Sequence, residues 1–358
     1  MPLVAHNELP TFSRLASEGH TVLSKSRATK QDIRELHIGL LNMMPDAALS
    51  ATENQFIRLV GNCNQIAQFY VYPFTLQELV RGDKAKKHIS EHYFTFEQLK
   101  KLGLDALIVT GANIQQPYLT EEPFWHPLTE VMEWAQNNVA STLCSCLATH
   151  AIVKQIYNID RIPLNQKRWG VYSHRIIQPD HPIMRNINTR FDVPHSRYNE
   201  IKRDQLEKAG LTVLAESDAA GVHMAVSPDQ IRAVYFQGHP EYDFNSLLKE
   251  YKREVIRFQL DEISEAPPFP DNYFPEEAKK IADTHINEII RSKNAKDSDA
   301  IFPEDQLNSF VDNTWGDTGK AIFNNWLGLV YSLTSHDRLK QYMAVSYTHL
   351  TLPTILLV

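Results

Sequence analysis

The string STLCSCLATHA carries the residue types and the spacing best suited to covalent chemistry. Its pattern predicts a short buried strand over Ser141–Ser145 and a helix over Ala148–Tyr157, with Cys146 at the turn between them. The N-terminus of a helix provides partial positive charge and free backbone N–H groups, which favour a thiolate and can hold an oxyanion. We therefore expect Cys146 to be a nucleophile. Cys144 lies within the strand and is expected to point into the sheet.

A second candidate lies in the string YFQGHPEYD, where His239 and Glu241 follow a strand that ends at Phe236. Two residues this far apart in a loop can face the same side, so Glu241 can hydrogen-bond one ring nitrogen and leave the other to take a proton. His-Pro-Glu is a weak motif by itself, because the chain has 15 histidines. Together with a cysteine at an elbow, it forms a coherent Cys–His–Glu triad.

The elements that must position these residues indicate an α/β fold. Apolar strands alternate with helical patterns in the first half of the chain, which implies right-handed crossovers and a doubly wound, mostly parallel sheet covered on both faces. After residue 161, shorter strands between Pro, Asn and Asp turns indicate an antiparallel extension of that sheet. The strands of the first half are predicted at 37–41, 66–71, 104–110 and 141–145, and those of the extension at 170–173, 212–215, 222–226 and 233–236.

We divide the chain into an N-terminal arm, a main α/β domain, a C-terminal extension and a tail. Their boundaries are 1–34, 35–262, 263–340 and 344–358. Helices are predicted over 243–260, 275–290 and 319–333, and the polar string RSKNAKDSDA is predicted to be a loop. The final string, AVSYTHLTLPTILLV, carries no charge and continues no pattern, so we interpret it as a non-native tail.

The bulk composition excludes several classes of protein. The chain has 358 residues, 43% of them hydrophobic, which is enough for a large core, and its net charge of −7 argues against nucleic-acid binding. Three cysteines, an odd and small number, do not make a disulfide framework, and they indicate a reducing, cytoplasmic compartment. Cys144 and Cys146 have the wrong spacing for a zinc knuckle and no second Cys pair follows, so no metal is expected. The N-terminal string does not resemble a signal peptide, and no segment is long and apolar enough to span a membrane.

The chain resembles a known family of acyltransferases. The string GHPE after an elbow cysteine is shared by class I glutamine amidotransferases and by the homoserine O-succinyl/acetyltransferases built on the same fold. The acyltransferase match is closer, because amidotransferase elbows carry Gly on both sides of the cysteine, whereas Ser145 and Leu147 stand here. It covers most of the chain up to about Ser335 and includes the strings SKSRA, LLNMMP, ATENQFIRL, ALIVTGA, FWHPLTEVMEWAQNNVASTL, KRWGVY, VPHSRYNE, GHPEYD, LKEYKREV, NYFP and FNNWLGLVY.

This resemblance implies a class I glutamine amidotransferase-like, flavodoxin-like fold and a homoserine O-acyltransferase of methionine biosynthesis. Cys146 would accept the acyl group of acetyl-CoA or succinyl-CoA as a thioester. His239 would activate Cys146 and then the hydroxyl of L-homoserine, with Glu241 supporting His239. No cofactor is expected besides the acyl-CoA substrate, and a homodimer stays open as the assembly.

The resemblance also implies three contacts to the amino-acid acceptor. Arg253 matches a family arginine that holds the carboxylate of the amino acid, and a guanidinium suits that task because it can bind a carboxylate with two hydrogen bonds. Lys167 and Ser196 match family positions that contact the acceptor. Taken without the resemblance, a lysine is usually solvated and a serine beside proline is usually a turn former.

Two departures from the family pattern bear on function, and a third, a longer segment, has no assigned role. The loop after LLNMMP usually carries lysines, one of which helps to polarise the acyl carbonyl, whereas Asp46 stands here. Either backbone N–H groups such as that of Leu147 or another cation must therefore hold the oxyanion. At the position that discriminates acyl donors, Gly leaves room for succinyl and Glu restricts the site to acetyl. This chain has Gln115, whose volume favours acetyl and whose amide could bind a succinyl carboxylate. The segment Ala278–Asp312 is longer than usual.

Several alternatives remain at this point. One is a glutamine-hydrolysing or peptidase-like hydrolase on the same fold, with water as the second nucleophile. Another is a catalytically impaired homologue that binds or regulates, which the altered loop at Asp46 keeps open. L-Serine is a third alternative, as acceptor, because it is one methylene shorter than homoserine and pockets discriminate such a difference only modestly.

Overall fold

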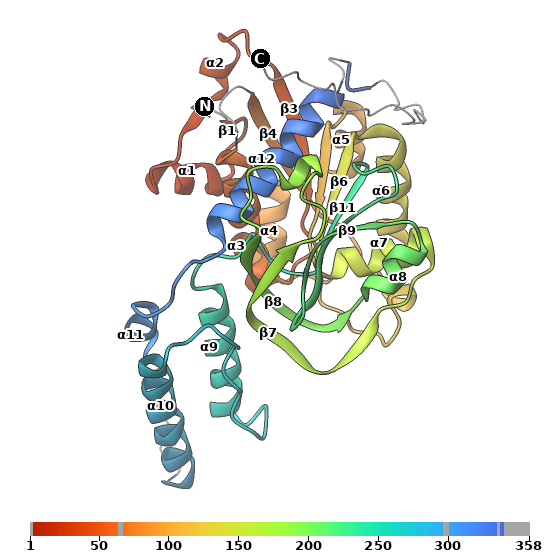
Figure 1. The fold of residues 1–358 in the computed structure, drawn as a ribbon. Coiled ribbons are helices and arrows are strands. Elements are labelled where there is room, and N and C mark those ends of the chain that lie inside the picture. Colours follow the sequence, from red (N-terminus) through yellow and green to blue (C-terminus); the bar gives the residue numbers. More distant parts are fainter. Residues whose placement is uncertain (1–2, 64–66, 296–300, 335–336, 340–358) are drawn as a thin grey trace.

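The structure is a computed structural model and describes residues 3–63, 67–295, 301–334 and 337–339. The predicted tail at 344–358 and part of the RSKNAKDSDA string lie outside the described residues. Within the described chain, one sheet of 11 strands has the order β2-β1-β4-β3-β5-β6-β11-β10-β9-β7-β8. Helices cover both faces of this sheet (Figure 1), so the α/β class is confirmed.

The first seven strands in this spatial order, which begins at β2 and reaches β11, pair in parallel and form one half of the sheet. Parallel strands place their carboxyl ends at one edge, so the loops that follow β3, β5, β6 and β11 meet there. This explains how residues far apart in the sequence reach one site. The bounds are β1 Leu3–Ala5, β2 Val22–Ser24, β3 Glu35–Leu41, β4 Gln68–Phe74, β5 Ala106–Val109, β6 Ser141–Ser145 and β11 Ala233–Phe236. Residues 1–34, predicted as an arm, thus add strands β1 and β2 to the sheet.

The other strands form the antiparallel extension, which differs in two ways from the prediction. β7 is far longer than the predicted strand at 170–173, and β8 was not predicted, because both contain many polar and charged residues. In addition, the strand at 233–236 was wrongly grouped with the extension, since β11 pairs in parallel with β6 and only its other edge is antiparallel to β10. The bounds are β7 Ile162–Ile176, β8 Arg190–Glu200, β9 Thr212–Ser217 and β10 Gly221–Val226.

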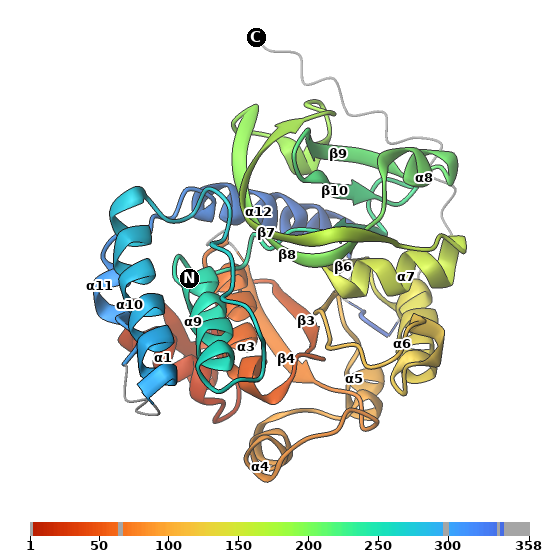
Figure 2. The ribbon, with the colours of Figure 1, turned by 90° about the horizontal axis from the view of Figure 1, so that it is seen from below.

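Two apolar cores lie on opposite faces of the sheet, and the helices divide between them (Figure 2). One core packs α1, α3 and α12 around Phe56, Phe323 and Trp326. The other packs α5, α6, α7 and α8 around Leu128, Ile152 and neighbouring residues. The bounds are α1 Pro10–Ser17, α2 Lys25–Ala28, α3 Asp46–Gly61, α4 Asp83–His92, α5 Phe96–Leu102, α6 Trp125–Asn138, α7 Leu147–Tyr157, α8 Arg203–Lys208 and α12 Gly316–Leu333, with short 3-10 helices at Leu119–Glu121 and Pro182–Met184.

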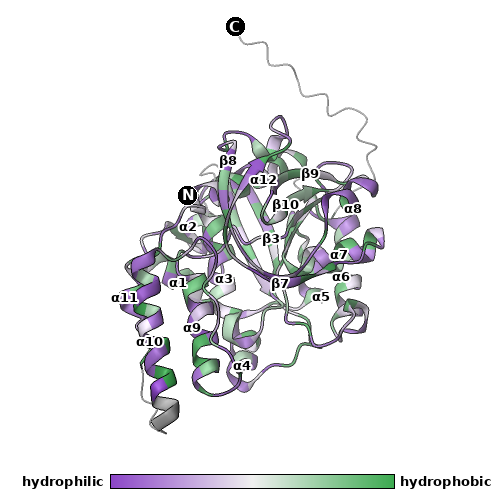
Figure 3. Cartoon of the chain, turned by 60° about the horizontal axis from the view of Figure 1, so that its bottom comes forward, coloured by the Kyte–Doolittle hydropathy of each residue, from purple (hydrophilic) through white to green (hydrophobic). Residues whose placement is uncertain are grey.

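A third, smaller core joins α9, Ser246–Gln259, to α10, Glu276–Ala295, and α11, Glu304–Asn308. These helices project from one side of the sheet (Figure 1), and hydrophilic residues follow much of their surface (Figure 3). α10 extends to Ala295, beyond the predicted end at 290. α12, which we grouped with the C-terminal extension, packs instead in the core around Phe56, Phe323 and Trp326. No helix within the described ranges is long and apolar enough to cross a membrane.

Candidate active site

Cys146 occupies a sharp turn between β6 and α7. Its backbone angles are φ 52° and ψ −111°, a region that residues with a side chain rarely adopt. The Cys146 N–H donates to the carbonyl of Phe236 over 2.8 Å, and the Thr149 hydroxyl donates to the same carbonyl over the same distance. These bonds hold the strained turn against β11. The turn leaves the Cys146 side chain partly accessible, whereas Cys144 is fully buried, and burial raises the pKa of the Cys144 thiol.

His239 and Glu241 lie beside Cys146, at the end of β11. The Nδ1 of His239 is 2.8 Å from Oε1 of Glu241, and the Ser145 hydroxyl donates to the same oxygen over 3.2 Å. Burial alone would lower the pKa of His239, but the charge of Glu241 and the hydrogen-bonded thiol of Cys146 hold that pKa well above its usual value. With Nδ1 bonded to the carboxylate, Nε2 is the nitrogen left to exchange a proton with the thiol.

Tyr242 packs against one face of the His239 ring. The two rings stack with centroids 4.3 Å apart and planes at 18°. The Tyr242 hydroxyl donates to Oε1 of Glu250 over 2.7 Å. The imidazole is therefore held by a hydrogen bond at its edge and by an aromatic ring on its face, which restricts it to one orientation.

Glu250 forms hydrogen bonds with two of the three residues that were predicted to bind the acceptor. Its Oε2 accepts from the Ser196 hydroxyl over 2.6 Å and from the Lys167 ammonium over 3.2 Å. Burial would raise the pKa of Glu250, but Lys167 and the hydrogen bonds from Ser196 and Tyr242 lower it below its usual value, so the carboxylate is ionised. Glu250 was not predicted as a site residue, because an acid within an amphipathic helix looks like any solvated residue. Its spacing three residues before Arg253 was the available signal.

The structure does not bring Arg253 into this cluster. Its side chain is 59% exposed and pairs with the adjacent Glu254 over 3.1 Å. Arg253 lies one helical turn after Glu250 on α9, and its charge lowers the pKa of Lys167, although burial is the larger cause of that shift. The guanidinium is therefore near the cluster but directed to solvent.

The loops after β3 and β5 meet the elbow at Gly111. A Cβ placed on Gly111 would lie 3.6 Å from Sδ of Met44, 3.8 Å from the backbone nitrogen of Leu147 and 3.9 Å from Cβ of Cys146. Leu147 is the first residue of α7, so its N–H has no partner within the helix. The glycine thus keeps side-chain bulk away from an N–H group that adjoins the thiol.

Asp46 makes structural contacts at the start of α3. It is the first residue of α3, so the loop after β3 ends at Pro45. Its carboxylate accepts from the Gly82 N–H over 2.7 Å and from Arg81 over 3.3 Å, and Arg81 also donates to the carbonyls of Met44 and Asn42. Asp46 and Arg81 together brace the loop after β3.

Gln115 lies in the loop after β5 with an exposed side chain. Its backbone N–H donates to Oε1 of the buried Glu122 over 2.6 Å, and the N–H of Gln116 donates to the same oxygen over 2.7 Å. The backbone of this loop is therefore fixed, whereas the Gln115 amide is free to turn.

Among the described residues, no group of three or more His, Cys, Asp or Glu side chains could hold a metal ion.

Comparisons with known proteins place the chain in a family. Similar solved structures include a glutamine amidotransferase from Thermotoga maritima, with 13% identity, a TM-score of 0.43 and coverage of 82% of this chain and 97% of that chain. Another is a glutamine amidotransferase from Methylobacillus flagellatus, with 12% identity, a TM-score of 0.44 and coverage of 83% and 95%. Likenesses at this level carry no argument about activity.

The sequence relatives are much closer. The homoserine O-succinyltransferase of Methylococcus capsulatus is 57% identical over 344 residues, which are 96% of this chain and 97% of that protein. The homoserine O-succinyltransferase of Nitrosococcus oceani is 56% identical over 343 residues, 96% of each chain. A family model described as homoserine O-succinyltransferase matches residues 2–336. The chain therefore belongs to the homoserine O-succinyltransferase family, as the resemblance in its sequence predicted.

Proposed function

We propose that this protein transfers the succinyl group of succinyl-CoA to the hydroxyl of L-homoserine, a step of methionine biosynthesis, through a thioester on Cys146. The observation that carries the proposal is the strained elbow of Cys146 with the His239–Glu241 pair beside it, in a chain whose relatives are named for this activity. A free nucleophilic thiol requires reducing conditions, so we place the enzyme in the cytoplasm.

In the first half-reaction, the Cys146 thiolate attacks the thioester carbonyl of succinyl-CoA. The developing oxyanion lies near the N–H of Leu147, in the space that Gly111 leaves open. The tetrahedral intermediate then collapses, the carbon–sulfur bond to CoA breaks, and the protonated His239 gives its proton to the departing CoA thiolate. The exchange of one thioester for another is nearly isoenergetic, so acylation is reversible.

In the second half-reaction, the now neutral His239 takes the proton of the homoserine hydroxyl. The alkoxide attacks the Cys146 thioester, an oxygen ester forms, and the Cys146 thiolate leaves. Transfer from sulfur to oxygen is downhill and drives the reaction forward. Glu241 stabilises the imidazolium that forms in this step and keeps Nε2 directed at the reacting atoms.

The acceptor is a small zwitterion, and the cluster around Glu250 suits it. The ionised carboxylate of Glu250 is complementary to the α-ammonium group of homoserine, and the Lys167 ammonium and the Ser196 hydroxyl are complementary to its polar atoms. Arg253 would reach the α-carboxylate by turning from Glu254 toward Lys167, a change of rotamer at an exposed site. A bound amino acid would compensate the charges of this cluster.

For the donor, we propose succinyl rather than acetyl as the preferred acyl group. Gln115 is similar in volume to Glu, but it is neutral and its exposed amide can donate a hydrogen bond to a carboxylate. A glutamate at this position would repel the succinyl carboxylate, whereas Gln115 would not. The bulk of Gln115 can be accommodated because its side chain lies at the surface.

Release of CoA thiol from succinyl-CoA and from acetyl-CoA, each with and without L-homoserine, tests this function. Wild type should release CoA continuously only with homoserine and faster from succinyl-CoA, and Cys146→Ala should release none. Cys63→Ala removes a buried cysteine of the first core and is the matched control, with activity retained. Equal turnover with L-serine would refute homoserine as the acceptor. Glutaminase activity without homoserine-dependent release would refute the transferase.

A further inference from the structure

A cavity of about 490 Å³ adjoins the loop that carries Gln115. One wall is the continuation of that loop, from Pro117 to Thr120, and the opposite wall comes from the end of α7 and the start of β7. The remaining lining residues are Lys154, Asp160, Arg161, Pro163 and Asn199. The cavity is therefore bounded by the loop of the predicted donor-discriminating position and by the helix that begins at the nucleophile.

Two cations line this cavity, and their surroundings differ. The Lys154 ammonium donates to Asp160 and to Asn158, each over 2.9 Å, so its charge is compensated within the protein. Arg161 is half-buried, and across the described ranges of the chain no carboxylate or other acceptor lies within bonding distance of its guanidinium. A partly desolvated cation without a close partner is unfavourable, and an anionic ligand would compensate it.

Arg161 lines the cavity together with the continuation of the loop that carries Gln115. Burial lowers the pKa of Arg161, and the charges of Glu122 and Cys146 partly offset that effect. A guanidinium nevertheless stays charged at every accessible pH. Glu122 accepts the two N–H groups of Gln115 and Gln116 through one oxygen and so fixes the loop whose continuation lines the cavity with Arg161.

We propose that Arg161 binds the carboxylate at the far end of the succinyl group and thereby makes the enzyme prefer a charged donor. This inference rests on the proposed function, since it assumes an acyl-CoA that reacts at Cys146. A guanidinium can hold a carboxylate with two parallel hydrogen bonds, so it fixes the direction of the acyl chain as well as its charge. A carboxylate bound at Arg161 would extend away from the thioester toward the cavity.

The phosphates of CoA are a second source of anionic charge that Arg161 could meet. The two sources can be separated by comparing succinyl-CoA with butyryl-CoA, which has the same number of acyl carbons and the same CoA but lacks the terminal carboxylate. Formation of the Cys146 thioester should be followed by intact-protein mass, without homoserine, for wild type, Arg161→Met and Arg161→Lys. Arg14→Met, an exposed arginine on α1 that pairs with Glu18, is the matched control.

Arg161→Met should slow acylation by succinyl-CoA roughly 10- to 100-fold, the range expected for loss of hydrogen bonds to a charged group. Acylation by butyryl-CoA should be unchanged, and Arg161→Lys should recover part of the succinyl rate. Thermal unfolding checks that each variant is folded. An equal loss with both donors would assign Arg161 to CoA phosphates or to structure and would overturn the proposal, as would no loss with either.

The two proposals fail in different ways. If wild type forms the thioester with both donors at the same rate, the role of Arg161 is refuted while the function of Cys146 stands. If wild type forms a thioester selectively from succinyl-CoA but does not transfer it to homoserine, the acceptor is refuted and Arg161 stands. A folded wild type that reacts with neither donor refutes the proposed function, and the Arg161 proposal with it.

Discussion

Replacement of Glu241 by glutamine should change the pH dependence of thioester formation as well as its rate. Glu241 is 4% exposed and its Oε1 lies 2.8 Å from Nδ1 of His239, which is itself 10% exposed. Glutamine keeps the shape of the side chain and removes its charge. Any change in the behaviour of His239 then reports on charge rather than on packing.

The size of the effect follows from this geometry. A hydrogen bond to a charged group contributes about 1.5–3 kcal/mol and a neutral one about 0.5–1.5 kcal/mol, so the imidazolium of His239 loses at least about 1–1.5 kcal/mol. Since about 1.4 kcal/mol corresponds to one pKa unit, the pKa of His239 should fall by about one unit, and further because the through-space attraction of the carboxylate is also lost. The rate should fall roughly 10- to 100-fold.

The sign of the pH effect follows from the raised pKa of His239. A raised pKa keeps the imidazole of His239 protonated to higher pH. In Glu241→Gln that form is lost at lower pH, so the alkaline limb of the acylation rate should move down by about one to two units. The assay is single-turnover CoA release at a series of pH values.

The control for this experiment is Glu262→Gln, which neutralises a carboxylate that is 54% exposed and pairs with Arg257 at the surface. Its rate and its profile should match those of wild type. An unchanged alkaline limb in folded Glu241→Gln protein would refute the electrostatic role of Glu241, even if the rate fell, because orientation alone would then explain the loss.

Three further predictions concern binding and stability. Glu250→Gln should raise the KM for homoserine by more than it lowers kcat, and the reverse pattern would contradict an acceptor-binding role. Both ring nitrogens of buried His223 lack a partner within the described residues, and burial holds its pKa well below 6.5. Unfolded chains therefore take up a proton as pH falls through about 6.5. His223→Phe should raise the free energy of unfolding by about 1–3 kcal/mol and reduce its loss between about pH 7 and pH 5, as measured by urea unfolding at both pH values. Gly170→Ala should destabilise the fold by about 1–3 kcal/mol in urea, because a Cβ would meet the Asp271 carbonyl at 2.2 Å, whereas Gly328→Ala meets nothing within 4 Å and should not.

Four strands of the parallel half, β3 to β6, and the elbow were predictable from the sequence, for a shared physical reason. Strands buried on both faces must be apolar along their whole length, so they stand out from the helices around them. The elbow around Cys146 combines such a strand with a helix start, and its two signals coincide at one residue. The α/β class and the family follow from the same strings.

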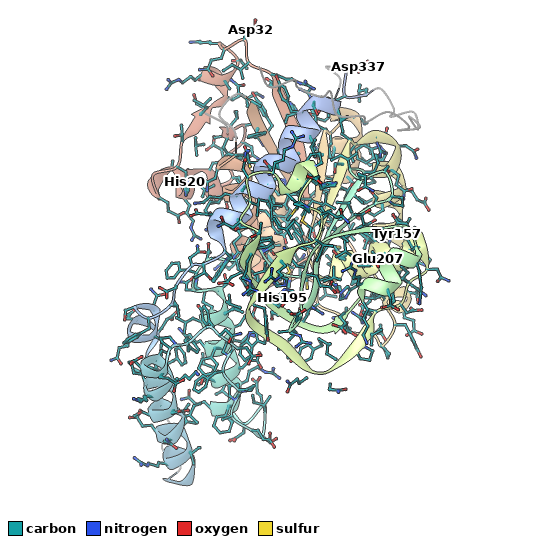
Figure 4. The ribbon with its side chains drawn as sticks, in the orientation of Figure 1. His20, Asp32, Tyr157, His195, Glu207 and Asp337 are labelled. Atoms are coloured by element: carbon teal, nitrogen blue, oxygen red, sulfur yellow. The ribbon has the colours of Figure 1, made fainter. Side chains whose placement is uncertain are left out.

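The antiparallel extension and the cluster around Glu250 were harder to predict, because their polar residues are buried where they form hydrogen bonds with one another. β8 places His195 and Arg197 inside the protein, where Nε of Arg197 donates to Nδ1 of His195 over 3.2 Å (Figure 4 labels His195). Nothing in the local sequence shows that these side chains will find partners. Glu250 is hidden for the same reason, since its three partners come from distant segments or from a tyrosine eight residues earlier.

The backbone angles of Cys146 lower the stability of the fold at the residue that the proposed activity requires. A side chain at φ 52° and ψ −111° costs of order 1–3 kcal/mol, and glycine would relieve much of that strain. A laboratory selection for heat resistance alone would therefore favour the loss of the thiol. Thermostable variants of this enzyme should be selected on turnover at the same time, and their substitutions placed away from the elbow, for example on the open face of α12 at Gly328.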